Sequence, residues 1–332
     1  MTSAPGDDRV CGEPRATVCR WWGDRRGALS FTFDDGYQGA IERAVRPLEA
    51  AGWRCTYAVP TGFVGRDLLP DPPCAAEPAA SWDDLSRLAA AGHEVCSHSV
   101  SHPELPTLDD DALRRELVDS QRALTERLGG PPGGTLVYPF GRFDERCSSL
   151  AAETYTCARG TRLRLCDPSV EELYRTDGAL IQRGMTCKHL ARWLEQCLEE
   201  RAWLIEAYHA VVTEDHPLWT AGYTYCWSDR RVREHLGHVR ALEADLWVAT
   251  HEQVASYVRQ RERSELRCTP LGADRFALSA RLADERSGAA PLTVALEAPP
   301  GRTLELEDTP GAAARLLVDV APGQPALRFR LR

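Results

Sequence analysis

Two short segments of the sequence concentrate residue types that bind metals or transfer protons. Asp34 and Asp35 are adjacent in TFDDG, directly after an apolar run. Neighbouring side chains on an extended backbone point in opposite directions, so we expect the two carboxylates to face different partners. His98 and His102 lie four positions apart in HSVSH, a spacing that brings two imidazoles to one ion if the backbone turns between them. His209 ends the apolar segment LIEAYH and is a fifth candidate.

Each of these signals has an ordinary explanation when it is taken alone. An acid pair in a loop is common, a single H-x-x-x-H is weak evidence, and an isolated histidine more often belongs to the core or the surface. Taken together, one carboxylate and two imidazoles are a ligand set for a divalent ion that keeps positions open for water and substrate. A second carboxylate and a third histidine then remain for proton transfer, and this combination suits hydrolysis of an amide.

The segments that carry these residues alternate between strand and helix patterns. Residues 28–33 are apolar and β-branched and predict a strand that enters a loop, while residues 38–51 have helical periodicity that stops at Gly52. Further strands are expected in HEVCSHS, TLVYPFG, TYTCARG, GALIQRG and AWLIEAYHAV, with helices at about 108–128 and 186–201. Repeated β-α units predict an α/β fold with a mostly parallel sheet, closed or nearly closed into a barrel.

The composition changes near Arg261. From Ser264 onward the chain contains no Trp, Tyr or His, and alternating patches such as LTVALEA and ALRFRLR are separated by Gly/Pro-rich turns. This pattern predicts a small antiparallel β-sandwich. We therefore expect an N-terminal extension over residues 1–26, a catalytic barrel over 27–262 and a small all-β domain over 263–332.

Four motifs in this order and spacing resemble those of the polysaccharide deacetylase family, carbohydrate esterase family 4. TFDDG is similar to the first motif, SHSVSH to the second, YPFG to the third, and the strand that ends in Tyr208-His209 to the last. The resemblance covers roughly residues 27–261. It implies a distorted (β/α)7 barrel, which agrees with the alternation of strands and helices.

The resemblance also implies a role for each candidate residue. Asp34 would be the catalytic base and His209 the general acid. The metal ligands would be Asp35, His98 and His102. Zinc is favoured by the mixed nitrogen and oxygen ligands, and cobalt, nickel or manganese would also be acceptable.

The third motif is expected to contact the substrate. A later aromatic cluster of Trp219, Tyr223, Tyr225 and Trp227 either offers surfaces to sugar rings or packs in the core or as a lid. The backbone N–H that follows Pro139 would help to stabilise the oxyanion. The candidates for substrate or oxyanion contact are Tyr138, Pro139, Phe140, Gly141, Arg183 and Trp227. Many family members carry an arginine two residues before the motif's proline, where this chain has Val137. Arg183 is the candidate replacement, and a surface salt bridge is the alternative for this residue. The usual Asp-Trp motif is not evident in this sequence.

Composition limits the partners and the compartment. The formal charge of -9 argues against nucleic acid as the main partner. The first residues lack the apolar stretch of an export signal, and nothing later approaches 18 consecutive apolar residues, so we expect a cytoplasmic protein without a membrane partner. Its twelve cysteines should then be mostly reduced thiols.

A cytoplasmic location favours a small N-acylated sugar or related metabolite as the substrate, because cell-wall polymers lie outside the membrane. The expected function is therefore a metal-dependent N-deacetylase. Two alternatives remain at this stage: a metal-independent hydrolase of a cyclic amide or ureide, and a carbohydrate-binding protein without catalytic activity.

Overall fold

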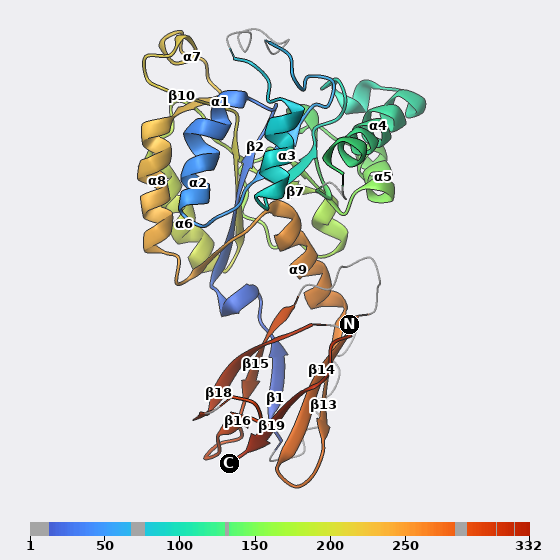
Figure 1. The fold of residues 1–332 in the computed structure, drawn as a ribbon, viewed down its shortest axis with the longest axis vertical. Coiled ribbons are helices and arrows are strands. Elements are labelled where there is room, and N and C mark those ends of the chain that lie inside the picture. Colours follow the sequence, from blue (N-terminus) through green and yellow to red (C-terminus); the bar gives the residue numbers. More distant parts are fainter. Residues whose placement is uncertain (1–12, 68–76, 130–132, 283–290, 310, 322) are drawn as a thin grey trace, which may run out of the picture. The chain divides into compact units, whose positions relative to one another are not determined.

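The computed structural model describes residues 13–67, 77–129, 133–282, 291–309, 311–321 and 323–332 (Figure 1). The chain divides into two compact units. Residues 25–258 form the larger unit, and the described residues up to Asp24 form the smaller unit together with residues from Arg259 onward.

The larger unit is built on a parallel sheet of nine strands within the described residues, in the order β7-β6-β5-β4-β3-β2-β9-β8, with β12 paired to β2. The two end strands of this path are separated in sequence by Gly178 alone, so the sheet is nearly closed into a barrel. The prediction of a (β/α) barrel is confirmed. The strands are β2 (Gly27–Phe33), β3 (Thr56–Val59), β4 (Glu94–Ser97), β5 (Thr135–Val137), β6 (Cys157–Gly160), β7 (Thr176–Asp177), β8 (Ala179–Leu180), β9 (Trp203–Tyr208) and β12 (Leu246–Val248).

Helices surround this sheet, as Figure 1 shows. Their ends follow local capping chemistry: Ser81 and Asp84 form a capping box at α3, and Asp109 caps α4, which ends at the left-handed Gly129. The main helices are α1 (Gln38–Ala40), η2 (Ile41–Val45), α2 (Arg46–Ala50), α3 (Trp82–Ala90), α4 (Asp110–Leu128), α5 (Glu145–Thr154), α6 (Cys187–Glu200) and α8 (Asp229–Ala241). Among the described residues, none of the helices has the length and apolar character needed to span a bilayer.

Strand β2 separates an apolar layer from a polar interior. Leu29, Phe31 and Phe33 belong to the apolar cluster that the sheet shares with the helices. Ser30 and Thr32, on the opposite face, point into the barrel, where the Ser30 hydroxyl accepts a hydrogen bond from an indole N–H. Side chains that point into a closed barrel are shielded from water, so the polar ones need partners inside.

A buried polar network occupies the barrel near the beginnings of its strands. Glu94 accepts hydrogen bonds from the Thr56 hydroxyl at 2.8 Å, the Thr135 N–H at 3.2 Å and the Glu252 N–H at 3.0 Å. His251 contacts the hydroxyl of Thr135 through Nδ1 at 3.2 Å. His251 and Glu252, the first two residues of α9 (His251–Arg263), therefore take part in this network.

The smaller unit is a β-sandwich, as predicted. One sheet has the order β1-β15-β18 and the other β13-β14-β19-β16-β17, and buried side chains from both sheets form one apolar cluster. The strands are β1 (Arg15–Val18), β13 (Ser264–Pro270), β14 (Arg275–Leu282), β15 (Leu292–Glu297), β16 (Leu304–Leu306), β17 (Ala312–Ala313), β18 (Arg315–Val320) and β19 (Leu327–Leu331). Strand β1 pairs antiparallel with β15, so part of the expected N-terminal extension contributes a strand to this sandwich.

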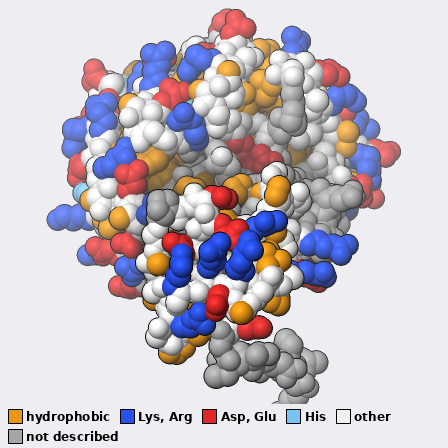
Figure 2. Space-filling view, turned by 60° about the horizontal axis from the view of Figure 1, so that its bottom comes forward, with side chains coloured by type: hydrophobic (Ala, Val, Ile, Leu, Met, Phe, Trp, Pro, Cys, Tyr) orange, Lys and Arg blue, Asp and Glu red, His pale blue; other side chains and the backbone are white. Residues whose placement is uncertain are grey.

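Strand β19 shows the alternation that made the sandwich readable from sequence. Phe329 and Leu331 are buried, whereas Arg328, Arg330 and Arg332 are exposed. Figure 2 shows basic side chains gathered beside acidic ones on the face turned toward the viewer. The period of two places charge on one face and the apolar core on the other.

Glu252 should make the stability of the barrel depend on pH. Burial, followed by the charge of Glu94, raises the pKa of Glu252 from 4.5 to about 7. Because this folded-state pKa lies above the unfolded one, the free energy of unfolding falls as pH rises between these two values. Glu252→Gln should raise the free energy of unfolding by about 2 kcal/mol at about pH 8 and by much less at about pH 5, measured by urea denaturation. The exposed control Glu195→Gln should leave both values unchanged, and an equal effect of Glu252→Gln at both pH values would contradict the assignment.

Candidate metal centre and proton-transfer residues

The candidate residues follow the carboxyl ends of three parallel strands. Asp34 and Asp35 follow β2, His98 follows β4, and His209 follows β9. Parallel strands place their carboxyl ends at one rim of the barrel, so residues far apart in sequence meet there. His102 reaches the same rim through the turn that begins at His98.

Three ligand atoms converge at this rim. Asp35 Oδ1 lies 3.3 Å from His98 Nε2 and 3.3 Å from His102 Nε2, and the two Nε2 atoms are 3.2 Å apart. An ion with bonds of about 2.1 Å sets its ligand atoms roughly 3.0–3.4 Å apart. The triangle therefore has the size that a small divalent cation requires.

The chemical character of the three donor atoms also suits a metal ion. Asp35 Oδ1 is buried and makes no hydrogen bond of good geometry with any described residue. The Nδ1 atom of His98 lies 2.7 Å from the carbonyl oxygen of Val137, so Nδ1–H donates there and the lone pair of Nε2 faces the other two ligands. A buried acceptor without a donor beside two imidazole nitrogens is the arrangement expected of a metal site.

The turn between the two histidines has an unusual backbone. Ser99 and His102 both have positive φ, at 67° and 57°, a region that residues other than glycine rarely adopt. Glu116 on α4 stabilises this turn, because its carboxylate accepts the N–H groups of Val100 at 2.8 Å and Ser101 at 2.9 Å. A strained turn held by a neighbouring helix is what brings His102 back toward His98.

The electrostatics of the cluster favour its ligand forms at neutral pH. Burial would raise the pKa of Asp35, but His209, His98 and His102 oppose it, and the net pKa lies well below the ordinary value. Burial, followed by the neighbouring His98, lowers the pKa of His102 to about 4, although Asp35 acts in the opposite direction. An ionised carboxylate and a neutral imidazole are the protonation states that bind a cation.

Asp34 has a different environment from Asp35, as expected from their opposite directions. Asp34 is 2% exposed, and one of its carboxylate oxygens accepts a hydrogen bond from the guanidinium of Arg159. Arg159 is fully buried on β6, and the same nitrogen lies 2.9 Å from the hydroxyl of Thr32. The guanidinium that contacts the candidate base is therefore that of Arg159.

This contact corrects the expectation for Arg183. Arg183 donates from Nε to the carbonyl of Trp219 at 3.1 Å, and its guanidinium lies 4.8 Å from the centre of that indole ring. The guanidinium of Arg231 lies 4.9 Å from the same ring. Arg183 thus helps to hold Trp219 and is not the partner of Asp34. The signal that could have revealed Arg159 is a charged residue inside the apolar strand TYTCARG.

His209 lies next to the ligand cluster. Its Nε2 is 3.7 Å from Asp35 Oδ2, and its ring lies 5.5 Å from that of Tyr225, which is 37% exposed. The Nδ1 atom of His209 is buried and has no hydrogen-bond partner among the described residues. This agrees with the absence of the usual Asp-Trp motif from the sequence.

The third motif contributes a ring and a backbone segment. Phe140, in η5 (Pro139–Gly141), has a φ of 58°, is half exposed, and its ring centre lies 4.6 Å from that of His102. Gly141 has a φ of 64°, and a Cβ at this position would lie 2.0 Å from the Thr161 hydroxyl oxygen. Tyr138 is fully buried, and its hydroxyl donates to the backbone carbonyl of Tyr174, so its side chain is not exposed to a substrate.

Trp227 is also corrected by the structure. Its side chain is 1% exposed, and its indole N–H donates to the carbonyl of Met185 at 3.0 Å. The ring packs in the apolar cluster near Tyr208, at 5.8 Å between ring centres. Of the aromatic residues expected to contact sugar, Tyr225 has the exposure and the position beside His209, whereas Trp227 belongs to the core.

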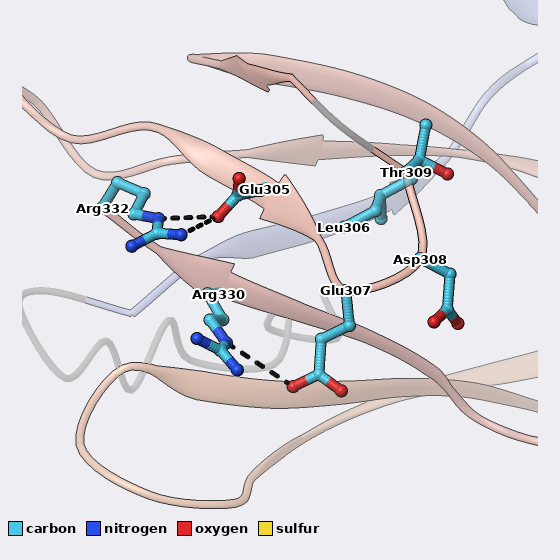
Figure 3. A pocket seen from close by; sticks show the side chains of 7 residues that line it. All are labelled: Glu305, Leu306, Glu307, Asp308, Thr309, Arg330 and Arg332. Atoms are coloured by element: carbon cyan, nitrogen blue, oxygen red, sulfur yellow. Dashed lines mark hydrogen bonds and ion pairs between the residues drawn. The ribbon is translucent and has the colours of Figure 1, made fainter.

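The β-sandwich carries a pocket of about 400 Å³, drawn in Figure 3. Its lining residues are Glu305, Leu306, Glu307, Asp308, Thr309, Arg330 and Arg332. The arginines pair with acids in the same pocket, Arg332 with Glu305 and Arg330 with Glu307. Because these charges neutralise one another, we assign the pocket no catalytic role.

The fold and the site define a nearly closed (β/α) barrel with a cluster of metal-ligand residue types at its rim. Residues 23–156 match the family model for polysaccharide deacetylase. Over this range the chain is similar to the polysaccharide deacetylase family. The matched range holds four of the five candidate reaction-centre residues, whereas His209 lies beyond it.

Individual relatives cover parts of the chain. A gellan lyase from a Bacillus species is 32% identical over 219 residues, which are 65% of this chain and 8% of the lyase. An uncharacterized 30.6 kDa protein from Geobacillus stearothermophilus is 30% identical over 125 residues, which are 37% of this chain and 42% of that protein. The chain thus matches less than half the length of both curated relatives.

Two solved structures show the same fold at low sequence identity. A protein from Mycobacterium smegmatis that is assigned to the polysaccharide deacetylases has a TM-score of 0.53 at 17% identity, over 74% of this chain and 94% of that chain. The PuuE allantoinase has a TM-score of 0.50 at 16% identity, over 72% of this chain and 92% of that chain.

Removing any one ligand should lower the zinc content of the purified protein. Asp35→Ala, His98→Ala and His102→Ala should each reduce it well below about one equivalent per chain, because each removes one of the three protein donors that converge in the described part of the chain. Elemental analysis after dialysis measures this, with the exposed His189→Ala as the control. Full occupancy in all three variants would show that the cluster is not the metal site.

Glu116 should affect metal binding without touching the metal. Glu116→Ala removes the acceptor of two backbone N–H groups in the His98–His102 turn, and we expect the zinc dissociation constant to rise about tenfold. Isothermal titration calorimetry measures it. Glu126→Ala, an exposed change on the same helix, is the matched control. An unchanged constant for Glu116→Ala would mean that the turn holds its shape unaided.

Proposed function

We propose that this protein is a metal-dependent hydrolase that removes an N-acetyl or similar N-acyl group from an amino sugar or related small amide. The observation that supports this most strongly is the convergence of Asp35, His98 and His102, with Asp34 and His209 beside them. A trio of ligands flanked by a carboxylate and an imidazole provides for both binding and proton transfer.

The chain's own residues would divide the reaction as follows. Asp34 takes the proton from the attacking water, and His209 donates a proton to the leaving amine. The backbone N–H of Phe140 stabilises the negative oxygen that forms when the carbonyl is attacked. Asp35, His98 and His102 would hold a divalent cation, zinc in the first place, and when bound it would polarise the carbonyl and make water more acidic.

A second candidate comes from the PuuE allantoinase, whose fold is similar. A hydrolase of a cyclic amide or ureide on this barrel could act without a metal. The fit of the Asp35, His98 and His102 donors to a cation favours the metal-dependent reading. A non-catalytic carbohydrate-binding protein would have no need of Asp34 and His209 at the rim.

The thiols of the structure bear on the compartment and the substrate. The cysteines from Cys55 onward in the described part of the chain are free thiols. Free thiols are usual in a reducing compartment, and we propose a cytoplasmic protein that acts on a small N-acylated sugar or metabolite. The rings of Phe140 and Tyr225, beside His102 and His209, would contact the sugar.

A panel of substrates tests the proposal. Zinc-loaded and chelator-treated protein would be assayed for acetate release from N-acetylglucosamine, its short oligomers, chitin and peptidoglycan, and for hydrolysis of allantoin. Metal-dependent release from the small sugars is the expected result. Faster release from the polymers would overturn the small substrate, and hydrolysis of allantoin that survives chelation would favour the second candidate.

Asp34→Asn should remove activity without removing the metal. The amide preserves the shape of the side chain but does not accept the proton, so kcat should fall by about 10³-fold while zinc content stays that of the wild type. Steady-state rates and elemental analysis on the same preparation measure both. Loss of zinc in this variant would exchange the roles of the two adjacent acids.

His209→Ala should slow the release of a poor leaving group most. An amine departs slowly unless it is protonated, so turnover of an N-acetylated sugar should fall by about 10²-fold or more. Hydrolysis of 4-nitrophenyl acetate, whose leaving group needs no proton, should change far less. Equal losses on both substrates would rule out His209 as the acid.

A further inference from the structure

Burial of the positively charged Arg159 side chain is unfavourable unless an anion pairs with it. Its side chain is fully buried inside the barrel, and its Nε–H has no hydrogen-bond partner among the described residues. Burying a guanidinium costs several kcal/mol unless a paired anion offsets the cost. The carboxylate of Asp34, itself almost fully buried, is the anion it contacts.

The barrel interior leaves room for this one long side chain. Ala58, Cys96 and Val137 form a small apolar cluster on β3, β4 and β5. On the other side of Arg159, a Cβ added to Gly178 would lie 3.5 Å from Arg159 Cδ and Nη1. The lack of a side chain at Gly178, between β7 and β8, thus leaves space for the Arg159 side chain.

The position of Arg159 relative to β5 carries the inference. In the parallel register of β5 and β6, Arg159 is the direct partner of Val137. Paired residues on adjacent strands point to the same face and lie about 4.8 Å apart. An arginine side chain is longer than this step, so a guanidinium that starts from either strand reaches the same region of the barrel.

We propose that Arg159 on β6 is the positioning residue of Asp34. It supplies the guanidinium that its partner on β5, Val137, does not provide. The guanidinium is planar and can donate two parallel hydrogen bonds, so it holds the Asp34 carboxylate in one orientation toward the attacking water. The two positions are then interchangeable: an arginine at 137 with a valine at 159 conserves the total volume and restores the contact. This inference rests on the proposed function for its kinetic consequence, but not for the contact itself.

The kinetic test compares Arg159→Met, the exchange Val137→Arg/Arg159→Val, and the exposed control Arg192→Met, all loaded with zinc. N-acetylglucosamine oligomers and 4-nitrophenyl acetate are the probes. Arg159→Met should lower kcat about 10²-fold with KM and zinc content nearly unchanged, because a misplaced base slows the reaction without weakening binding. The exchange should recover most of this loss. Wild-type kcat in Arg159→Met, or no recovery in a folded exchange variant, would overturn the proposal.

A second measurement tests the contact between Arg159 and Asp34 without an activity assay. Urea unfolding of the metal-free wild type, Asp34→Asn, Arg159→Met and the double variant forms a double-mutant cycle. Arg159→Met should lower the folding equilibrium constant about 100-fold or more in the wild type, because it leaves a buried charge unpaired. In the Asp34→Asn background the loss should be at least about tenfold smaller. Equal losses in both backgrounds would reduce Arg159 to a space-filling role.

The two measurements separate the proposals. If the zinc-loaded wild type hydrolyses none of the probes, the proposed function fails, while the unfolding cycle still decides whether Arg159 and Asp34 are coupled. If the wild type is active but the cycle shows no coupling, the proposed function stands and the positioning role of Arg159 is overturned.

Discussion

The arrangement of this barrel depends on one constraint: polar groups that point into a nearly closed sheet must find their partners inside it. Glu94 meets this constraint near the strand beginnings, where it accepts three hydrogen bonds. Arg159 and Asp34 meet it near the strand ends by pairing with each other. Asp35 Oδ1, by contrast, is a buried acceptor at the rim without a hydrogen bond among the described residues. A buried polar group without a partner at the rim of a barrel marks the place where a reaction site is expected.

The same rim combines rigid and strained elements. Strand ends position Asp35 and His98, whereas His102 depends on a turn with positive φ at two residues that are not glycine. Glu116 on α4 accepts hydrogen bonds from that turn, so a helix that carries none of the candidate ligands helps to set the distance between the two imidazoles. The strand ends and this turn together hold the three donor atoms 3.2–3.3 Å from one another.

Much of the candidate site could be predicted from sequence because the signals are local. TFDDG and HSVSH each place two candidate residues within five positions, and the apolar segment LIEAYH indicates the strand that carries His209. Residues whose roles depend on distant partners could not be predicted in this way. Arg159 was missed because its contact with Asp34 joins residues 125 positions apart. Trp227 was assigned to substrate because an aromatic residue near a site looks the same in sequence whether it packs inward or outward.

The sequence by itself determined the alternation of strands and helices, the β-rich tail and the set of candidate site residues, since periodicity and motif spacing are properties of neighbouring residues. Only the tertiary structure decided which guanidinium meets the buried carboxylate, which aromatic ring is exposed beside His209, and how closely the three ligand atoms approach. These depend on the register between strands and on the closure of the sheet. Register pairs Arg159 with Val137 across two strands, and no local pattern encodes that pairing, because it arises only when separate segments pack together.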